Sequence, residues 1–394
     1  MVSRCPAFLA RVGGVRIRSQ SEIRNPQSAI RNPQSHVLVA DVGGTHISIA
    51  VFAHYGNGKL QAVRHKTFRS RTVQDFPALL SKFLKEEGRD LTPAVRQACI
   101  DFAGPVGPKR DKGTITNLGW GFTAREVFDA IPVEELTLLN DFEAVGFGLE
   151  VLLANCPEAF VRLSPAGKLP GQNGRKPTAV VIGAGTGLGT SILIEDVRTG
   201  KYRPIPGEGG HVDFEAVDEL EFRAAGWIRK HINRSPGNPM DRERIVSGPG
   251  LVNLYRALSE LEPGDGNPRI AAEVVKADVY DRPAVIIQHA GRDTRCRRTL
   301  DIWLRCYARA AKNSAIFPLT PGGVFLAGGI AAKILPEMQS GLFMKEFMRC
   351  DIPNIRSLLK RTPVFIVTDY RIGLFGCANV ALNFFNEMGL RRTK

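Results

Sequence analysis

The sequence predicts an α/β fold organised around two glycine-rich turns. Strand-like and helix-like segments alternate along the body of the 394-residue chain, which favours mixed sheets flanked by helices over separate all-α or all-β parts. The turns, residues 41–45 and 183–189, lie about 140 residues apart, and each is entered from a β-like run and left by another. Because glycines let backbone N–H groups face an anion, two such turns could hold a polyphosphate from opposite walls of a cleft between two domains.

The composition is that of an ordinary soluble globular protein, and the length favours two domains. Hydrophobic residues make up 43% of the chain and charged residues 23%. No apolar run reaches the roughly 18 residues that a membrane helix needs. The seven cysteines are scattered without CxxC or metal-ligand spacing, so we expect reduced thiols, no membrane association and a cytoplasmic location.

The net charge of +14 does not indicate a nucleic-acid-binding protein once it is divided along the chain. Residues 1–35 contain six arginines and one acidic residue, Glu22, and so contribute +5. The remaining +9 is spread over 359 residues, without a Lys/Arg stripe that carries interleaved aromatic side chains. We therefore expect no nucleic-acid partner.

The first 35 residues differ from the rest of the chain. They contain a short repeat, IRNPQSAIRNPQS at residues 23–35, and show no helical or strand periodicity. The segment is rich in arginine and poor in acidic residues, as organelle transit peptides are, but it lacks an amphipathic stripe. We expect a disordered leader, or a start site assigned too far upstream, and a folded chain that begins near His36.

The first half of the body reads as strands followed by a helix. An apolar run at 37–40 leads into the first glycine turn, and residues 47–52 then alternate as in a strand with one face more deeply buried. The turn at 56–58 joins this strand to another at 60–68. Thr72 is the expected N-cap of the helix that follows, whose apolar positions have helical spacing up to Gly88.

Further elements continue the alternation. Strands are expected at 97–103, at 136–139 and at 178–182, where the last one opens the second glycine turn. A turn-rich stretch at 163–177 is expected to be a surface loop. Apolar residues between 300 and 311 follow one helical face, and residues 322–330 read as strand, glycine turn and helix.

Asp141 is the first candidate for chemistry. It follows the strand predicted at 136–139, so its carboxylate would project from a strand end into the cleft. Phosphoryl transfer needs a carboxylate that accepts the proton of the acceptor hydroxyl, and partial burial could tune Asp141 for that role. The alternative is that Asn140 and Asp141 together cap a helix over 142–149.

A second polar group consists of Glu208, His211 and Glu243. Two carboxylates and an imidazole suit a polyhydroxylated sugar, because a dry pocket discriminates strongly through hydrogen bonds that must be matched. His211 could instead be a hydrogen-bonded structural histidine, and Glu243 a surface charge near a helix start. A metal site made of Glu208 and His211 would lack a third evident ligand.

Taken together, the motifs resemble those of bacterial glucokinases of the hexokinase-like, ATP-dependent type. The resemblance spans roughly residues 36 to 390. It is carried by eight blocks in the family's order: LVADVGGT at 38–45, FAGPV at 102–106, TNLGW at 116–120, LNDFEA at 139–144, GTGLG at 185–189, PGEGGH at 206–211, ERIVSGPGL at 243–251 and LAGGI at 326–330.

This resemblance implies an actin-like, ribonuclease H-like sugar kinase with an active-site cleft between two domains. The small α/β domain would comprise residues 36–150 plus 372–394, and the large α/β domain residues 151–371. The implied reaction is the ATP-dependent phosphorylation of glucose to glucose 6-phosphate, with Mg²⁺ as the accompanying ion. A homodimer is a possible assembly.

The family's functional residues map onto this chain as expectations. Asp141 would be the general base on the sugar 6-hydroxyl, and Asp41 would contact the water shell of the metal, with no dedicated protein metal site. The residues expected to bind glucose are Asn140, Asp141, Glu208, His211 and Glu243. Those expected to bind ATP are Ala40, Asp41, Val42, Gly43, Gly44, Thr45, Gly183, Gly185, Thr186, Gly187 and Gly189 at the phosphates, and Gly328 and Gly329 near adenosine.

Some residues of this chain differ from the family pattern, and alternative functions stay open. Where the family commonly has Asn and Arg after the first glycine turn, this chain has His46 and Ser48. A zinc-containing sugar-kinase family shares the fold, but its cysteine cluster is missing between Cys156 and Cys296. The alternative functions are a kinase for mannose, fructose or glucosamine, and a catalytically silent sugar-sensing protein of the same fold.

Overall fold

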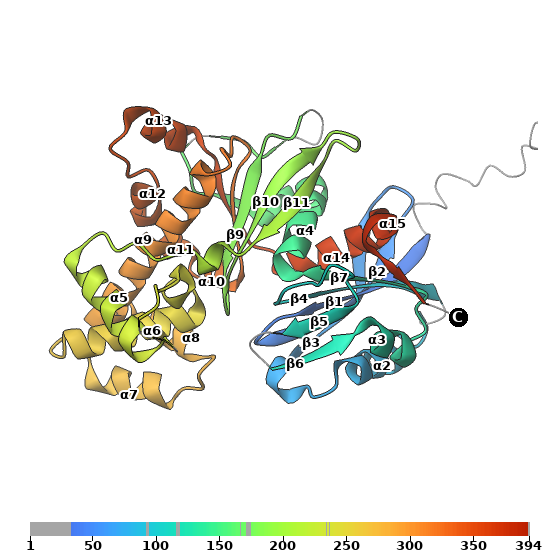
Figure 1. The fold of residues 1–394 in the computed structure, drawn as a ribbon, viewed down its shortest axis with the longest axis horizontal. Helices are drawn as coiled ribbons and strands as arrows, with labels where there is room; N and C mark the ends of the chain where they lie inside the picture. The colour runs from blue at the N-terminus through green and yellow to red at the C-terminus, as the bar shows by residue number, and fades with distance from the viewer. Residues whose placement is uncertain are drawn as a thin grey trace, which may run out of the picture.

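The computed structural model describes residues 33–392, apart from 92–93, 116–118, 166, 171–174, 234 and 236. All but three residues of the predicted leader, residues 1–35, lie outside this described part. Two six-stranded mixed sheets, each flanked by helices, dominate the described chain (Figure 1). The α/β prediction is therefore confirmed.

The first sheet has the strand order β14-β7-β4-β1-β2-β3. Its middle strands β1, β4 and β7 are parallel neighbours, while β2, β3 and β14 pair antiparallel. The bounds are β1 Ser35–Val42, β2 His46–His54, β3 Leu60–Arg69, β4 Val95–Phe102, β7 Glu135–Asn140 and β14 Leu390–Arg391, with a separate ribbon of β5 Lys112–Ile115 and β6 Trp120–Thr123.

The second sheet repeats this topology. Its order, β11-β10-β9-β12-β13-β8, places three parallel strands beside an antiparallel hairpin and an antiparallel edge strand, as in the first sheet. Both glycine turns therefore lie at equivalent places, one between β1 and β2 and the other between β9 and β10. The bounds are β8 Phe160–Arg162, β9 Ala179–Ala184, β10 Leu188–Asp196, β11 Lys201–Gly207, β12 Gly323–Ala327 and β13 Val364–Val367.

Both faces of the first sheet are buried because alternate side chains point to different helices. Leu38 and Ala40 pack against the outer helices α2 (Phe76–Glu86) and α3 (Ala124–Ala130). Val37 and Val39 face α4 (Asp141–Asn155) and α14 (Ile372–Asn383), in a core that also contains residues of the second sheet. The helices α4 and α14 thus lie between the two sheets (Figure 1).

Glycines make the contact between α4 and α14 close. A side chain at Gly148 would overlap the backbone carbonyl of Ile372, and one at Gly376 would overlap the carbonyl of Ala144. The two helices each follow the third parallel strand of their sheet, α4 after β7 and α14 after β13. This packing joins the sheets and directs both helix N-termini toward the space between them.

The remaining helices cover the outer face of the second sheet. The long helix α9 (Thr294–Ile316) carries the predicted apolar face, and Leu300, Trp303, Leu304, Tyr307, Ala308 and Ala311 are all buried there. Around it lie α5 Glu219–His231, α6 Gly248–Leu261, α7 Pro268–Lys276, α8 Arg282–His289, α10 Gly329–Lys333, α11 Leu335–Met338, α12 Leu342–Phe347 and α13 Pro353–Arg361, while α15 Phe385–Met388 leads back to the first sheet. Short 3-10 turns occur at Ser70–Thr72, Pro157–Ala159, Gly209–His211 and Arg242–Arg244.

One predicted boundary is wrong. Helix α2 begins at Phe76, and its N-cap is Asp75, whose carboxylate accepts a hydrogen bond from the Ala78 N–H. Thr72 instead ends a 3-10 turn and donates its hydroxyl to the Arg69 carbonyl at 2.7 Å. Proline near the first helical position favours a start at this point, since its missing N–H and fixed φ suit the first turn.

The strands of the first sheet come from residues 35–140 and 390–391, and those of the second from residues 160–207 and 323–367. The boundaries expected from the sequence, 36–150 plus 372–394 and 151–371, fall close to α4 and α14. We keep this division into two domains as a proposal. None of the helices in the described part of the chain combines the length and apolar character that a bilayer crossing requires.

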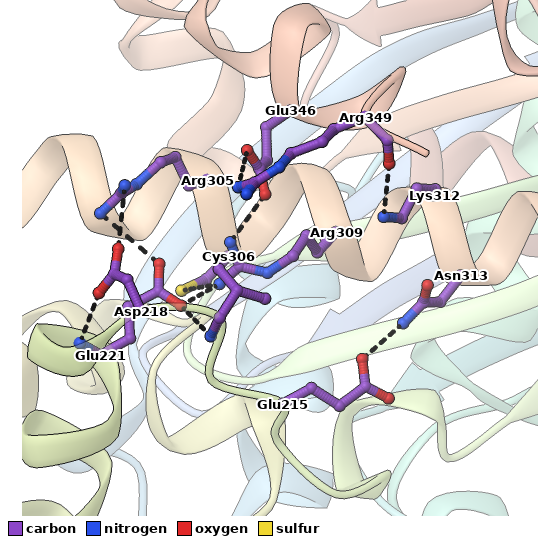
Figure 2. A network of polar contacts seen from close by, with 11 residues as sticks. Glu215, Asp218, Glu221, Arg305, Cys306, Arg309, Lys312, Asn313, Glu346 and Arg349 are labelled. Atoms are coloured by element: carbon purple, nitrogen blue, oxygen red, sulfur yellow. Dashed lines mark hydrogen bonds and ion pairs between the residues drawn. The ribbon is translucent and has the colours of Figure 1, made fainter. Parts of the chain in front are cut away.

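A buried network of charges ties three helices of the second half together (Figure 2). Arg309 of α9 donates to Glu221 of α5 at 2.7 Å and to Glu346 of α12 at 3.0 Å, and all three side chains are at most 7% exposed. Arg349, whose side chain is 64% exposed, lies at the edge of the network, 3.5 Å from Glu346. The network holds α5 and α12 against α9.

Removal of the central arginine should destabilise the fold. Arg309→Met leaves the buried Glu221 and Glu346 carboxylates with only the longer contacts to Arg305 and Arg349, so we expect a loss of about 3–5 kcal/mol in the free energy of unfolding. The matched variant Arg349→Met removes an exposed partner of the same glutamate and should cost less than about 1 kcal/mol. Chemical denaturation followed by circular dichroism measures both; equal losses would contradict the assignment of Arg309 as the buried centre.

Candidate active site

A cavity of about 900 Å³ lies between the two sheets. Asp41 and Asp101 line it from the first sheet, and Asp141 lines it from the start of α4. The turn after β12, with Gly328 and Gly329, and residues 367–374 between β13 and α14 form the opposite wall. The site is thus built from the carboxyl ends of strands in both sheets, where ligands of open α/β sheets bind.

Three carboxylates meet in this cavity because three parallel strands end beside one another. Asp41 of β1 and Asp101 of β4 are partners in register, so their side chains point to the same face of the sheet. Asp141 follows the last residue of the next strand, β7. The Asp141 carboxylate therefore lies where the sequence predicted it, at a strand end that faces the cavity.

The sequence left open whether Asn140 and Asp141 together cap a helix or whether the Asp141 carboxylate projects into the cleft. Asn140 is the N-cap of α4: its Oδ1 accepts hydrogen bonds from the N–H groups of Phe142 at 3.0 Å and Glu143 at 3.2 Å. Its Nδ2 donates to the carbonyl of Gly104 at 3.2 Å. Asp141 Oδ1 also accepts the Phe142 N–H at 2.9 Å, so both residues contribute to the cap, and the Asp141 carboxylate lines the cavity from the first turn of the helix.

Burial and neighbouring charges alter the proton affinity of all three aspartates. Burial raises the pKa of Asp141 to about 7, and the negative charges of Asp41 and Glu208 add to this rise, while the Phe142 N–H opposes it. Burial, followed by the charge of Asp41, raises the pKa of Asp101 well above its ordinary value. Burial also raises the pKa of Asp41.

The two glycine turns touch each other across the cleft. Thr45 Oγ1 and Thr186 Oγ1 share a hydrogen bond at 2.8 Å. The first turn is closed by Gly43 N–H donating to the His46 carbonyl at 3.0 Å, and the second by Gly185 N–H donating to the Gly187 carbonyl at 2.8 Å. Segments that are 141 residues apart in the chain are therefore brought into contact.

Several of the predicted nucleotide-binding residues pack rather than face the cavity. Ala40 and Val42 are fully buried on the side of the sheet that faces α2 and α3. Gly183 and Gly189 lie against the Phe142 ring, where an added Cβ would overlap it. Gly328 has a φ of +86° and, together with Gly329, lines the cavity.

Glu243 contacts the second glycine turn directly. Its Oε2 accepts a hydrogen bond from the Leu188 N–H at 2.7 Å. Gly187 leaves the space that this carboxylate occupies, since a Cβ there would lie 2.6 Å from Oε2. Glu243 is therefore part of the support of the turn, a role that its position in the sequence did not reveal.

Glu208 and His211 follow β11 and have exposed side chains. His211 Nδ1 lies 3.2 Å from Asp241 Oδ2, and its Nε2 lies 3.9 Å from Glu208 Oε2. In the described part of the chain, the residues that line the 900 Å³ cavity do not include Asn140, Glu208, His211 or Glu243. Glu208 is nevertheless close enough to Asp141 for its charge to raise the pKa of that carboxyl.

Asp101 was not predicted as a site residue. The strand was predicted at 97–103, but its carboxylate was not singled out. The available signal was positional: Asp101 follows an apolar run at a strand end, as Asp41 and Asp141 do. His46 and Ser48, the two departures from the family pattern, line the same cavity together with His65 and Thr67.

Comparisons with known proteins find relatives that match most of this chain. A glucokinase from Yersinia enterocolitica is 32% identical over 342 residues, which cover 87% of this chain and 95% of that relative. The solved glucokinase of an Antarctic psychrotroph superposes with a TM-score of 0.67 at 25% identity, covering 89% of this chain and 99% of that one.

A more distant structure shares the fold. The ROK family glucokinase from Streptomyces griseus, solved in complex with glucose and AMPPNP, has a TM-score of 0.59 at 17% identity and covers 88% of this chain and 99% of its own. These likenesses confirm the actin-like sugar kinase fold. The family model named Glucokinase matches residues 38–384, and on this match the chain belongs to the glucokinase family.

Proposed function

We propose that the chain transfers the terminal phosphoryl group of ATP to the 6-hydroxyl of glucose, with Asp141 as the general base. The observation that carries this proposal is the place of Asp141, at a strand end inside the cavity between the two sheets. Membership of the glucokinase family supports it. The structural neighbour from Streptomyces griseus, which was solved in complex with glucose and AMPPNP, supports the same pair of substrates.

Asp141 is suited to accept a proton near neutral pH. With a pKa of about 7, it is partly ionised at physiological pH and still basic enough to receive a hydroxyl proton. As the sugar oxygen attacks the terminal phosphorus and the bond to ADP breaks, the hydroxyl proton passes to the carboxylate. The cap made by Asn140 keeps the first turn of α4 in place while this occurs.

The sugar would be held by groups around this base. We assign Glu208, His211 and Glu243 to the sugar hydroxyls as acceptors or donors, and Asn140 through its amide hydrogen that is not given to Gly104. Glu208 and His211 are exposed, so their engagement would require the cleft to close over the sugar. Closure would also exclude water and so suppress ATP hydrolysis.

The polyphosphate would lie along the two glycine turns. The backbone N–H groups of residues 43–45 and 185–187 are the assigned donors, and the hydroxyls of Thr45 and Thr186, which now bond each other, would turn to the phosphates. Gly183 and Gly189 act indirectly, by allowing the turn to pack on Phe142. Gly328 and Gly329 are assigned to the adenosine end.

The residues present fit a hard divalent cation such as Mg²⁺. Asp101 Oδ1 is buried without a hydrogen-bond partner, and Asp41 lies beside it in register. Within the described residues, no group of three or more ligating side chains could hold a metal ion, so phosphate and water oxygens would complete its shell. When bound, the ion would neutralise charge on the phosphates. A cytoplasmic location and a homodimer stay predictions from the sequence.

The first test is the sugar dependence of ADP release. With Mg-ATP fixed, glucose should give the highest kcat/KM in a panel that also contains mannose, fructose and glucosamine. Preference for another hexose would replace glucose in the proposal. Binding of glucose without ADP release would favour the sugar-sensing alternative.

Replacement of the base should stop the chemistry but not binding. Asp141→Asn keeps the size of the side chain but cannot accept the proton, so kcat should fall by about 10²–10⁴-fold. Glucose affinity, measured by quenching of intrinsic fluorescence, should change little. Near-normal turnover would remove Asp141 from the role of base.

The acid limb of the pH profile should report Asp141. As pH falls through about 7 the carboxylate takes up a proton, so kcat/KM for glucose should decrease toward low pH. Glu208→Gln removes a negative charge that raises the pKa of Asp141, and the midpoint of this limb should therefore move to lower pH. The exposed Glu219→Gln should leave the midpoint in place. A midpoint shift to higher pH in Glu208→Gln would contradict the assignment.

A further inference from the structure

The geometry points to Asp101 as a second carboxylate that, with Asp41, holds the divalent cation accompanying the nucleotide. This inference rests on the proposed function and extends it to a residue that neither the family motifs nor the sequence analysis singled out. Four observations carry it: the register of the two aspartates, the Asp101 oxygen without a hydrogen-bond partner, the glycine that faces both carboxylates, and the lack, among the described cavity residues, of a lysine or arginine paired with them.

The register fixes the two carboxylates side by side. Asp41 and Asp101 are direct partners on the parallel neighbours β1 and β4. Both side chains line the cavity, at the edge where these strands end. Two carboxylates on adjacent strands at the same height form a ready pair of oxygen ligands on a rigid part of the fold.

One oxygen of Asp101 is held by the protein and the other is not. Oδ2 accepts a hydrogen bond from the Cys377 thiol at 3.3 Å. Oδ1 has no hydrogen-bond partner within the protein, and the residue is only 1% exposed, so bulk water does not satisfy this oxygen either. Buried polar atoms are normally satisfied, so an oxygen without a partner, on a residue that lines the cavity, indicates a missing ligand.

The first turn of α14 leaves room beside the pair. Gly373 faces the pair, and a Cβ there would lie 3.2 Å from Asp101 Oδ2 and 3.4 Å from Asp41 Oδ2. Any side chain at this position would crowd both carboxylates. Glycine at 373 therefore adds no side-chain atom beside the two carboxylates.

Among the described residues that line the cavity, no lysine or arginine is paired with Asp41 or Asp101. Arg371 lines the cavity, but its guanidinium is bound to Asp369, with hydrogen bonds of 3.0 and 2.7 Å. Buried charges in proteins are paired or coordinate metals. A divalent cation with phosphate and water as further ligands satisfies both Asp41 and Asp101 and leaves Asp141 free as the base.

The experiment separates metal binding from turnover. Binding of ADP to wild type and to Asp101→Asn is measured by titration calorimetry, once without metal and once with Mn²⁺, and bound Mn²⁺ is counted by electron paramagnetic resonance. We expect Mn²⁺ to tighten ADP binding in wild type, and we expect Asp101→Asn to lose about tenfold or more of that gain. Metal-free ADP affinity and glucose affinity should stay within about twofold of wild type.

Two controls exclude a purely structural effect. Glu158→Gln removes another carboxylate that lines the same cavity and should keep the full Mn²⁺-dependent gain. Thermal unfolding of the free protein should show Asp101→Asn at least as stable as wild type, because the change removes a carboxyl whose ionised form is disfavoured by burial and by Asp41. A residue needed only for folding would lower the Tm.

The outcomes are distinct. If Asp101→Asn keeps the Mn²⁺-dependent increase in ADP affinity, the inference is overturned, and the two aspartates share a proton instead. The proposed function would still be supported by the turnover of wild type. Failure of wild type to bind ADP with or without Mn²⁺ would overturn the proposed function and this inference together. Loss of the gain in Asp101→Asn alone, with Glu158→Gln unaffected, supports the assignment.

Discussion

The close packing of α4 on α14 is the constraint on which the site depends. Gly148 and Gly376 let the two helix backbones meet, and a larger residue at either place would push the helices apart. Because each helix follows the third parallel strand of its sheet, their contact also sets the spacing of the two sheets. The packing of α4 on α14 therefore positions both walls of the cavity. One wall carries the aspartates, and the other carries the glycine turn after β12.

The repeated topology explains why the cleft has matching parts on both sides. In each sheet the first hairpin carries a glycine turn, and the third parallel strand leads into one of the two packed helices, α4 or α14. Only the first sheet, however, ends its parallel strands in Asp41, Asp101 and the Asn140–Asp141 pair. Placing these carboxylates together in a buried cavity opposes stability, since burial and mutual repulsion favour their neutral forms. The arrangement is understandable where a cation and a substrate hydroxyl will occupy the same space.

Local patterns were enough to predict much of this molecule. The alternation around the first turn, the helical face of α9 and the strand before Asp141 were confirmed because each depends on near neighbours in the chain. The N-cap of α2 was wrong because Thr72 and Asp75 are both good capping residues, and the nearby proline decided between them. The packing of Gly183 and Gly189 on Phe142 was not foreseen, since it joins segments about 40 residues apart.

By itself, the sequence determined the α/β class, the two glycine turns, the position of Asp141 at a strand end and the family resemblance, because these are written in short-range spacing and composition. Only the tertiary structure decided that Asp101 stands beside Asp41, that Glu243 supports the second turn, and that Asn140 caps while Asp141 faces the cavity. These facts follow from strand order and helix packing. They depend on which distant segments share a surface, and that is settled when the whole core is assembled.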